Sequence, residues 1–94
     1  MHLVLPGYER NAPTLEIFQY EENLDHPEIA PNRKGFGHIA FKVDNVSEVL
    51  ARLLQHGGSA LGDLVETDIA GAGHLTFVYA RDPDGNIIEL QNWS

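Results

Sequence analysis

The chain has 94 residues, and its 14 acidic and 6 basic side chains give a formal net charge of −8 with neutral histidine. The basic residues form no cluster, so we do not expect a nucleic acid partner, because phosphate binding needs a basic face. The lack of cysteine excludes disulfides and thiolate sites. No apolar run nears the roughly 20 residues of a membrane helix. We therefore expect one cytoplasmic domain with no membrane partner.

The N-terminal part of the chain contains two short extended runs. His2 to Leu5 and Thr14 to Tyr20 are rich in apolar and aromatic side chains and are separated by proline, glycine and asparagine. This pattern predicts a hairpin with a long loop within residues 1–22. Residues 23–35 are polar, contain two prolines and follow neither the strand nor the helix period, which indicates a linker.

From residue 36 onward the pattern becomes regular. In residues 36–43 large apolar side chains alternate with polar or small ones, and this alternation predicts a strand. Either residue of the Asp-Asn pair at 44–45 can cap a helix, whose apolar stripe runs from Val46 to Leu54. The Gly-Gly pair at 57–58 then ends the helix, because glycine tolerates the left-handed backbone found there.

Three further extended segments follow at residues 64–69, 74–81 and 87–92. Between the last two lies the sequence DPDGN, whose proline, glycine and polar side chains predict a tight hairpin turn. Residues 36–94 therefore spell strand, helix, strand, strand, strand. This order predicts an α+β fold in which one helix covers a face of a sheet.

Strand alternation divides the predicted sheet into two faces. The apolar face, which the helix stripe would cover, consists of Ile39, Phe41, Val43, Ile88 and Leu90. His38 and Glu89 fall on the opposite face, where an imidazole and a carboxylate are available to a ligand or a metal. Polar side chains on such a face also point at water without any function, so the alternation alone leaves both interpretations open.

The motifs GFGHIAFKVDNV, a helix ended by GG, and FVYARDPDGNIIELQ occur in this order. Together they resemble the vicinal oxygen chelate superfamily of glyoxalases, bleomycin-resistance proteins and extradiol dioxygenases. The resemblance implies a β-α-β-β-β module at residues 36–94, with a mixed, curled sheet that forms part of a cup around a divalent metal. It also implies that His38 and Glu89 are ligands of this metal, which would be zinc, nickel, cobalt, iron or manganese.

The N-terminal hairpin resembles the last two strands of a preceding module that is incomplete. TLEIFQY stands in the place of NIIELQN, so Glu16 matches Glu89 and the resemblance implies that it is a third metal ligand. Measured against the family pattern, the first strand, helix and second strand of that module are absent, and with them its histidine ligand. If Val4 pairs with Glu16, His2 lies diagonally across the hairpin on the same face and is a weak substitute ligand.

The opposite face of the hairpin carries Leu15 and Ile17, which have no helix in this chain to cover them. Exposed apolar strands favour association. We therefore expect a homodimer or larger assembly, whose cup is completed by modules from two chains. Truncation of a longer protein is the alternative explanation.

The resemblance implies a metal-dependent, glyoxalase-like enzyme that acts on a small oxygen-chelating substrate by isomerase, epimerase or lyase chemistry. The metal would act as a Lewis acid, and Glu89 would be both a ligand and the catalytic base. Two alternatives remain open: a metal-free ligand-binding protein like the bleomycin-resistance proteins, and an inactive fragment. Of the other histidines, we expect His74 to be solvated at a strand end. We expect His56 to interact favourably with the C-terminus of the helix.

Overall fold

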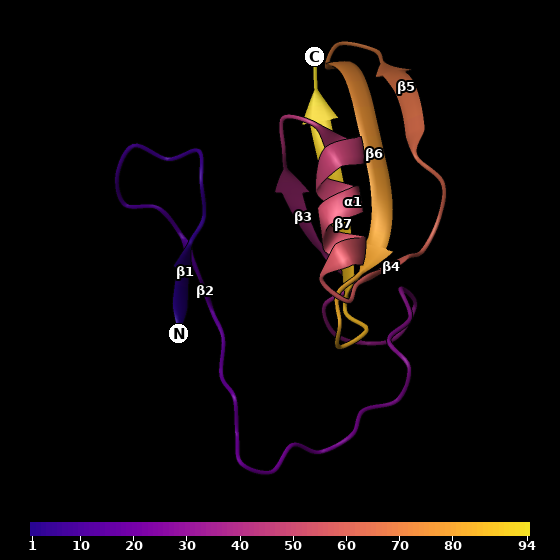
Figure 1. Cartoon of the computed structure of the whole chain (residues 1–94). Coiled ribbons are helices and arrows are strands. Elements are labelled where there is room, and N and C mark those ends of the chain that lie inside the picture. Colours follow the sequence, from indigo (N-terminus) through magenta and orange to yellow (C-terminus); the bar gives the residue numbers. More distant parts are fainter.

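The computed structural model describes all 94 residues. The strands are β1 (His2–Val4), β2 (Thr14–Glu16), β3 (Ile39–Lys42), β4 (Ser59–Ala60), β5 (Val65–Ile69), β6 (Gly73–Arg81) and β7 (Ile87–Trp93), and the helix is α1 (Val46–Gln55). Figure 1 shows β1 and β2 standing apart from the other elements, joined to them by a long extended segment. We call residues 1–20 the arm and residues 36–94 the body.

The body contains a mixed sheet of five strands with α1 on one face (Figure 1). The first strand, β3, lies at the edge and pairs in parallel with the last strand, β7. β7 pairs antiparallel with β6, which in turn pairs with β4 at one end and with β5 at the other. This arrangement confirms the predicted α+β fold with a mixed sheet and one covering helix.

Local chemistry determines both ends of α1. The side chain of Asn45 accepts a hydrogen bond from the Glu48 N–H at 3.0 Å, so the second residue of the predicted Asp-Asn pair is the cap. At the other end Gly57 has a φ of +96°, and the Gly58 N–H donates to the Leu53 carbonyl at 3.0 Å. These bonds close the helix as the glycine pair predicts. The helix has ten residues, and no helix of the chain is long and apolar enough to cross a membrane.

The core lies between α1 and the sheet. Its buried centre consists of Val46, Val78 and Leu90, against which pack the partly buried side chains of Phe41, Val43, Val49, Leu50 and Ile88. The predicted apolar face is therefore confirmed except at Ile39, which is 50% exposed. Ile39 begins the edge strand β3 and lines a cavity on the side of the arm, so the core does not cover it.

Two predicted strands are shorter in the structure than the sequence pattern indicates. β3 begins at Ile39 and not at residue 36, and its pairing with β7 begins at Ile39 opposite Ile88. β2 ends at Glu16, because only the three residues of β1 pair with it. The two-residue strand β4 was not predicted, since so short a segment carries no alternation.

The register of the arm also differs from the expectation. His2 pairs with Glu16, and Val4 pairs with Thr14, so the pairing of Val4 with Glu16 is wrong by two residues. The long loop between the strands does not fix their register in the way a two-residue turn does. Neither strand of the arm contacts any other strand or the helix.

Candidate metal and catalytic site

His38 and Glu89 meet on the sheet face opposite α1. Glu89 lies near the middle of β7, between two residues that pack toward the helix, so strand alternation turns it to the other face. His38 immediately precedes β3, and its Nε2 is 3.1 Å from Glu89 Oε1. The His38 side chain is 34% exposed and that of Glu89 is 11% exposed, so the carboxylate is nearly covered while the imidazole reaches solvent.

Tyr79 covers the carboxylate from the neighbouring strand. It pairs directly with Glu89 across β6 and β7, and its ring meets the His38 ring edge to face at 5.1 Å. Burial raises the pKa of the Tyr79 phenol above its ordinary value, and the charge of Glu89 and a hydrogen bond to it raise that pKa further. Tyr79 therefore stays protonated near neutral pH and is a hydrogen-bond donor beside the carboxylate.

The second carboxylate oxygen is held by a side chain that the sequence did not single out as functional. Gln91 Nε2 donates to Glu89 Oε2 at 3.0 Å, and Trp93 Nε1 donates to Gln91 Oε1 at 2.8 Å. All three residues lie on one face of β7 at intervals of two. Strand alternation from Glu89 was the available signal, since it places Gln91 and Trp93 on the same face.

The donor atoms of the pair fit a divalent transition metal. An imidazole nitrogen and a carboxylate oxygen are both common ligands of such ions. His38 Nε2 and Glu89 Oε1 are separated by 3.1 Å, with a carboxylate oxygen and an imidazole nitrogen as donors. Zinc, nickel, cobalt, iron and manganese all accept this combination.

Glu16 lies on the arm and is not brought to the pair. Its side chain is 49% exposed, and its Oε1 is 3.6 Å from His2 Nε2 on the facing strand. Glu16 and His38 line the same cavity, which has a volume of about 640 Å³. No three histidine or acidic side chains come close enough to hold a metal together. The His2–Glu16 pair of the arm and the His38–Glu89 pair of the body are thus separate.

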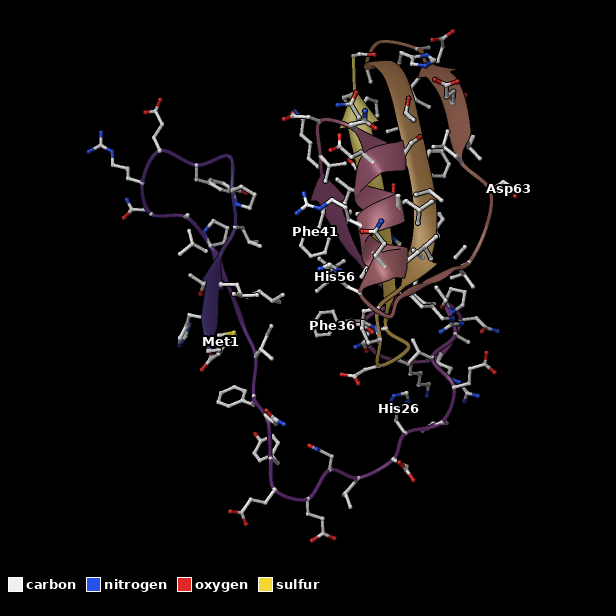
Figure 2. The ribbon with its side chains drawn as sticks, in the orientation of Figure 1. Met1, His26, Phe36, Phe41, His56 and Asp63 are labelled. Atoms are coloured by element: carbon white, nitrogen blue, oxygen red, sulfur yellow. The ribbon has the colours of Figure 1, made fainter.

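The cavity between the arm and the body has a mainly apolar lining. Nine of its 15 lining residues are hydrophobic, among them Ile17 and Phe18 of the arm and Phe36 and Ile39 near the start of the body. Figure 2 shows the rings of Phe36 and Phe41 on the side of the body that faces the arm. The volume of this cavity is in the range of small-molecule sites.

The remaining histidines lie outside this site. His74 Nδ1 is 2.8 Å from Asp68 Oδ1 on the neighbouring strand, and its Nε2 is 3.7 Å from Glu66. Both contacts raise the His74 pKa, and the contact with Asp68 has the larger effect. His26 contacts the backbone carbonyls of Pro27 and Asp84, which raises its pKa and ties the linker to the β6–β7 turn.

Comparison with known proteins identifies relatives over most of the chain. The model of the Glyoxalase/Bleomycin resistance protein/Dioxygenase superfamily matches residues 7–90. Lactoylglutathione lyase of Escherichia coli O157:H7 is 31% identical over 84 residues, which cover 89% of this chain and 57% of that enzyme. Biphenyl-2,3-diol 1,2-dioxygenase 3 of Rhodococcus globerulus is 34% identical over 65 residues, which cover 69% of this chain and 33% of that protein.

A solved structure shows the same similarity. The crystal structure of a glyoxalase family protein from Bacillus cereus has a TM-score of 0.61 and 25% sequence identity, covering 77% of this chain and 46% of the other. The chain thus spans between a third and three fifths of the length of these relatives.

Proposed function

Because the chain belongs to the Glyoxalase/Bleomycin resistance protein/Dioxygenase superfamily, we propose that it is a metal-dependent cytoplasmic enzyme of the glyoxalase type. Its substrate would be a small molecule with neighbouring oxygen atoms, and its chemistry that of a lyase, isomerase or epimerase. The observation that carries the proposal is the 3.1 Å contact between His38 Nε2 and Glu89 Oε1 on the sheet face away from the helix. The similarity to a lactoylglutathione lyase and a dioxygenase supports an enzyme.

We assign His38 and Glu89 as two ligands of a divalent metal and Glu16 as a third. Glu16 faces the same cavity as His38, and half of its side chain is exposed, so its carboxylate is free to take a metal. It can join the pair only when an arm closes on a body. His2 then comes with it, because the two residues are paired directly across the arm.

Glu89 is the residue we expect to move the proton of the substrate. A divalent metal held by the pair would supply a Lewis acid that polarises the substrate oxygens. The Glu89 carboxylate is nearly covered, and each of its oxygens contacts a fixed polar side chain, so its direction is set before substrate binds. Tyr79 keeps its proton beside it and therefore does not compete as a base.

The partner we propose for the arm is a second copy of this chain. No residue of the arm is buried, and its exposed apolar side chains include Leu3, Ile17 and Phe18. A lone two-stranded hairpin has little stability in water. We propose that residues 1–22 are the remnant of an incomplete module, joined by the linker 23–35 to the complete module 36–94, and that two chains together complete the cup.

A metal-free ligand-binding protein is the second candidate. It is favoured by the apolar lining of the 640 Å³ cavity, which could hold a small molecule without any metal. The two candidates differ in whether His38 and Glu89 hold an ion.

Metal content tests the proposed function directly. The chain is prepared without chelator, dialysed against Zn²⁺, Ni²⁺, Co²⁺, Mn²⁺ or Fe²⁺ in turn, freed of excess ion and analysed by mass spectrometry of the elements. We expect retention of one of these ions by the wild type and its loss in His38→Ala. His56→Ala is the matched control, since His56 is an exposed histidine at the C-cap of α1. A wild type that retains no ion, or a His38→Ala variant that retains it fully, contradicts the metal assignment.

The solution mass tests the second copy. Sedimentation equilibrium should give twice the 10.4 kDa mass of the chain. Ile17→Asp should lower this mass toward that of one chain, because it places a charge on the apolar surface of the arm. A wild type that stays monomeric at high concentration contradicts the shared cup without bearing on His38 and Glu89.

A further inference from the structure

Three side chains on one face of β7 form a hydrogen-bonded row. They are Glu89, Gln91 and Trp93, which alternation turns to the same side of the strand. Trp93 Nε1 donates to Gln91 Oε1 at 2.8 Å, and Gln91 Nε2 donates to Glu89 Oε2 at 3.0 Å. The row ends at His38, whose Nε2 lies 3.1 Å from the other oxygen of Glu89.

The chemistry of these groups allows only one order of donors and acceptors. An indole nitrogen can donate a hydrogen bond but cannot accept one. The amide oxygen of Gln91 therefore faces Trp93, and the amide nitrogen faces Glu89. The reversed amide would place its oxygen against a carboxylate oxygen and lose both hydrogen bonds. Trp93 thus determines, through Gln91, which group the carboxylate meets.

Apart from His38 and the Tyr79 hydroxyl, packing leaves the carboxylate few other partners. Tyr79 and Phe77 of β6 pair with Glu89 and Gln91, and their two rings meet edge to face at 5.9 Å. The Glu89 side chain is only 11% exposed. If Gln91 released it, little water could replace the lost hydrogen bond, and the carboxylate would turn away from its present direction.

We propose that Gln91 and Trp93 are positioning residues of the candidate metal site. Trp93 orients the Gln91 amide, and the amide holds Glu89 so that its Oε1 points at the atom of His38 that would share an ion with it. This inference rests on the proposed function, in which Glu89 is a metal ligand. Neither positioning residue touches the metal or the substrate, and both act only through Glu89.

The first test measures Zn²⁺ affinity by calorimetry on the whole chain. Gln91→Met removes both hydrogen bonds of the amide at similar volume, and Trp93→Phe removes only the indole donor. We expect Gln91→Met to weaken Zn²⁺ binding by about 10- to 100-fold, as for other groups that orient a metal ligand. Trp93→Phe should weaken it by a smaller factor. Gln55→Met, at the exposed end of α1, is the matched control and should bind as the wild type does.

The double variant separates positioning from general damage. Because Trp93 acts only through Gln91, Gln91→Met combined with Trp93→Phe should bind Zn²⁺ no more weakly than Gln91→Met alone. Effects that multiply in the double variant would overturn the inference. An unchanged affinity in Gln91→Met would overturn it as well.

A second readout needs no metal and keeps the two proposals distinguishable. Trp93 is the only tryptophan, so its indole N–H gives a single signal in the proton–nitrogen spectrum of the metal-free chain. Removing its acceptor in Gln91→Met should move this signal upfield and speed its exchange with water. If the wild type binds Zn²⁺ and the signal does not move, the row alone is refuted. If the signal moves and the wild type binds no Zn²⁺, the proposed function fails, and the positioning role fails with it.

Discussion

Gly58 occupies a position where a single added methyl group has no room. It follows the end of α1 and precedes β4, which pairs with the end of β6. A Cβ at this position would lie 2.8 Å from the backbone oxygen of Arg81 and 2.6 Å from Cγ of Leu53. The leucine can change its rotamer, but the Arg81 oxygen belongs to a paired strand. Gly58→Ala must therefore push α1 or β4 away from the sheet.

The cost of this change can be worked out from two opposing effects. Overpacking of this kind costs about 1–3 kcal/mol, while replacing glycine by alanine restricts the unfolded chain and returns about 0.4–1 kcal/mol. Gly62→Ala has only the second effect, because a Cβ there meets nothing within 4 Å. Since both substitutions restrict the unfolded chain alike, the difference between their free energies of unfolding should be about 1–3 kcal/mol.

Urea unfolding followed by the fluorescence of Trp93 measures this difference, because the single tryptophan lies on the central strand β7 of the body. Gly58→Ala should lower the urea midpoint without changing the slope of the transition. Gly62→Ala should leave the midpoint unchanged or raise it. Equal midpoints for the two variants would refute the reasoning, since they would mean that the contact with the Arg81 oxygen costs nothing.

Three further predictions concern the core, the helix and an ion pair. Val78→Ala, at a side chain that is 0% exposed, should lower the free energy of unfolding by about 2–3 kcal/mol, whereas Val4→Ala on the exposed arm should change it by less than about 0.5 kcal/mol in the same urea titration. Asn45→Ala removes the cap of α1 and should cost about 0.5–2 kcal/mol, with a lower helix signal in circular dichroism. Because the His74 pKa is raised in the folded state, its contact with Asp68 stabilises the fold below the ordinary histidine pKa, and this contribution is lost as pH rises through the raised value. Asp68→Asn should therefore lower the His74 pKa in an NMR titration, and an unchanged value would refute the assigned cause.

The elements predicted correctly are those whose cause lies in a few neighbouring residues. The β6–β7 turn is an example: Asp82 accepts hydrogen bonds from the backbone N–H groups of Asp84 and Asn86, and Gly85 takes a φ of +87°. The helix is another, since its cap, stripe and closing glycines act within one segment. The face that carries His38 and Glu89 was also predictable, because alternation along each strand is local.

What the sequence could not supply depends on contacts between distant segments. The register of the arm is one case, since no tight turn or core fixes how His2 meets Glu16. The exposure of Ile39 is another, because it depends on the place of β3 at the edge of the sheet, which follows from pairing with the distant strand β7. The orientation of Gln91 could not be predicted either. It follows from the indole donor of Trp93 and not from a residue type that is typical of catalytic or metal sites.

The parallel pairing of β3 with β7 gives the His38–Glu89 pair a further property. The two residues are 51 positions apart in the chain and meet because the first and last strands of the body lie side by side. The pair therefore exists only after a long loop has been closed, at the entropic cost that such closure carries. A ligand that bridges the pair acts as a clasp between the two ends of the body, and its binding free energy adds to the global stability of the body rather than to that of one hairpin.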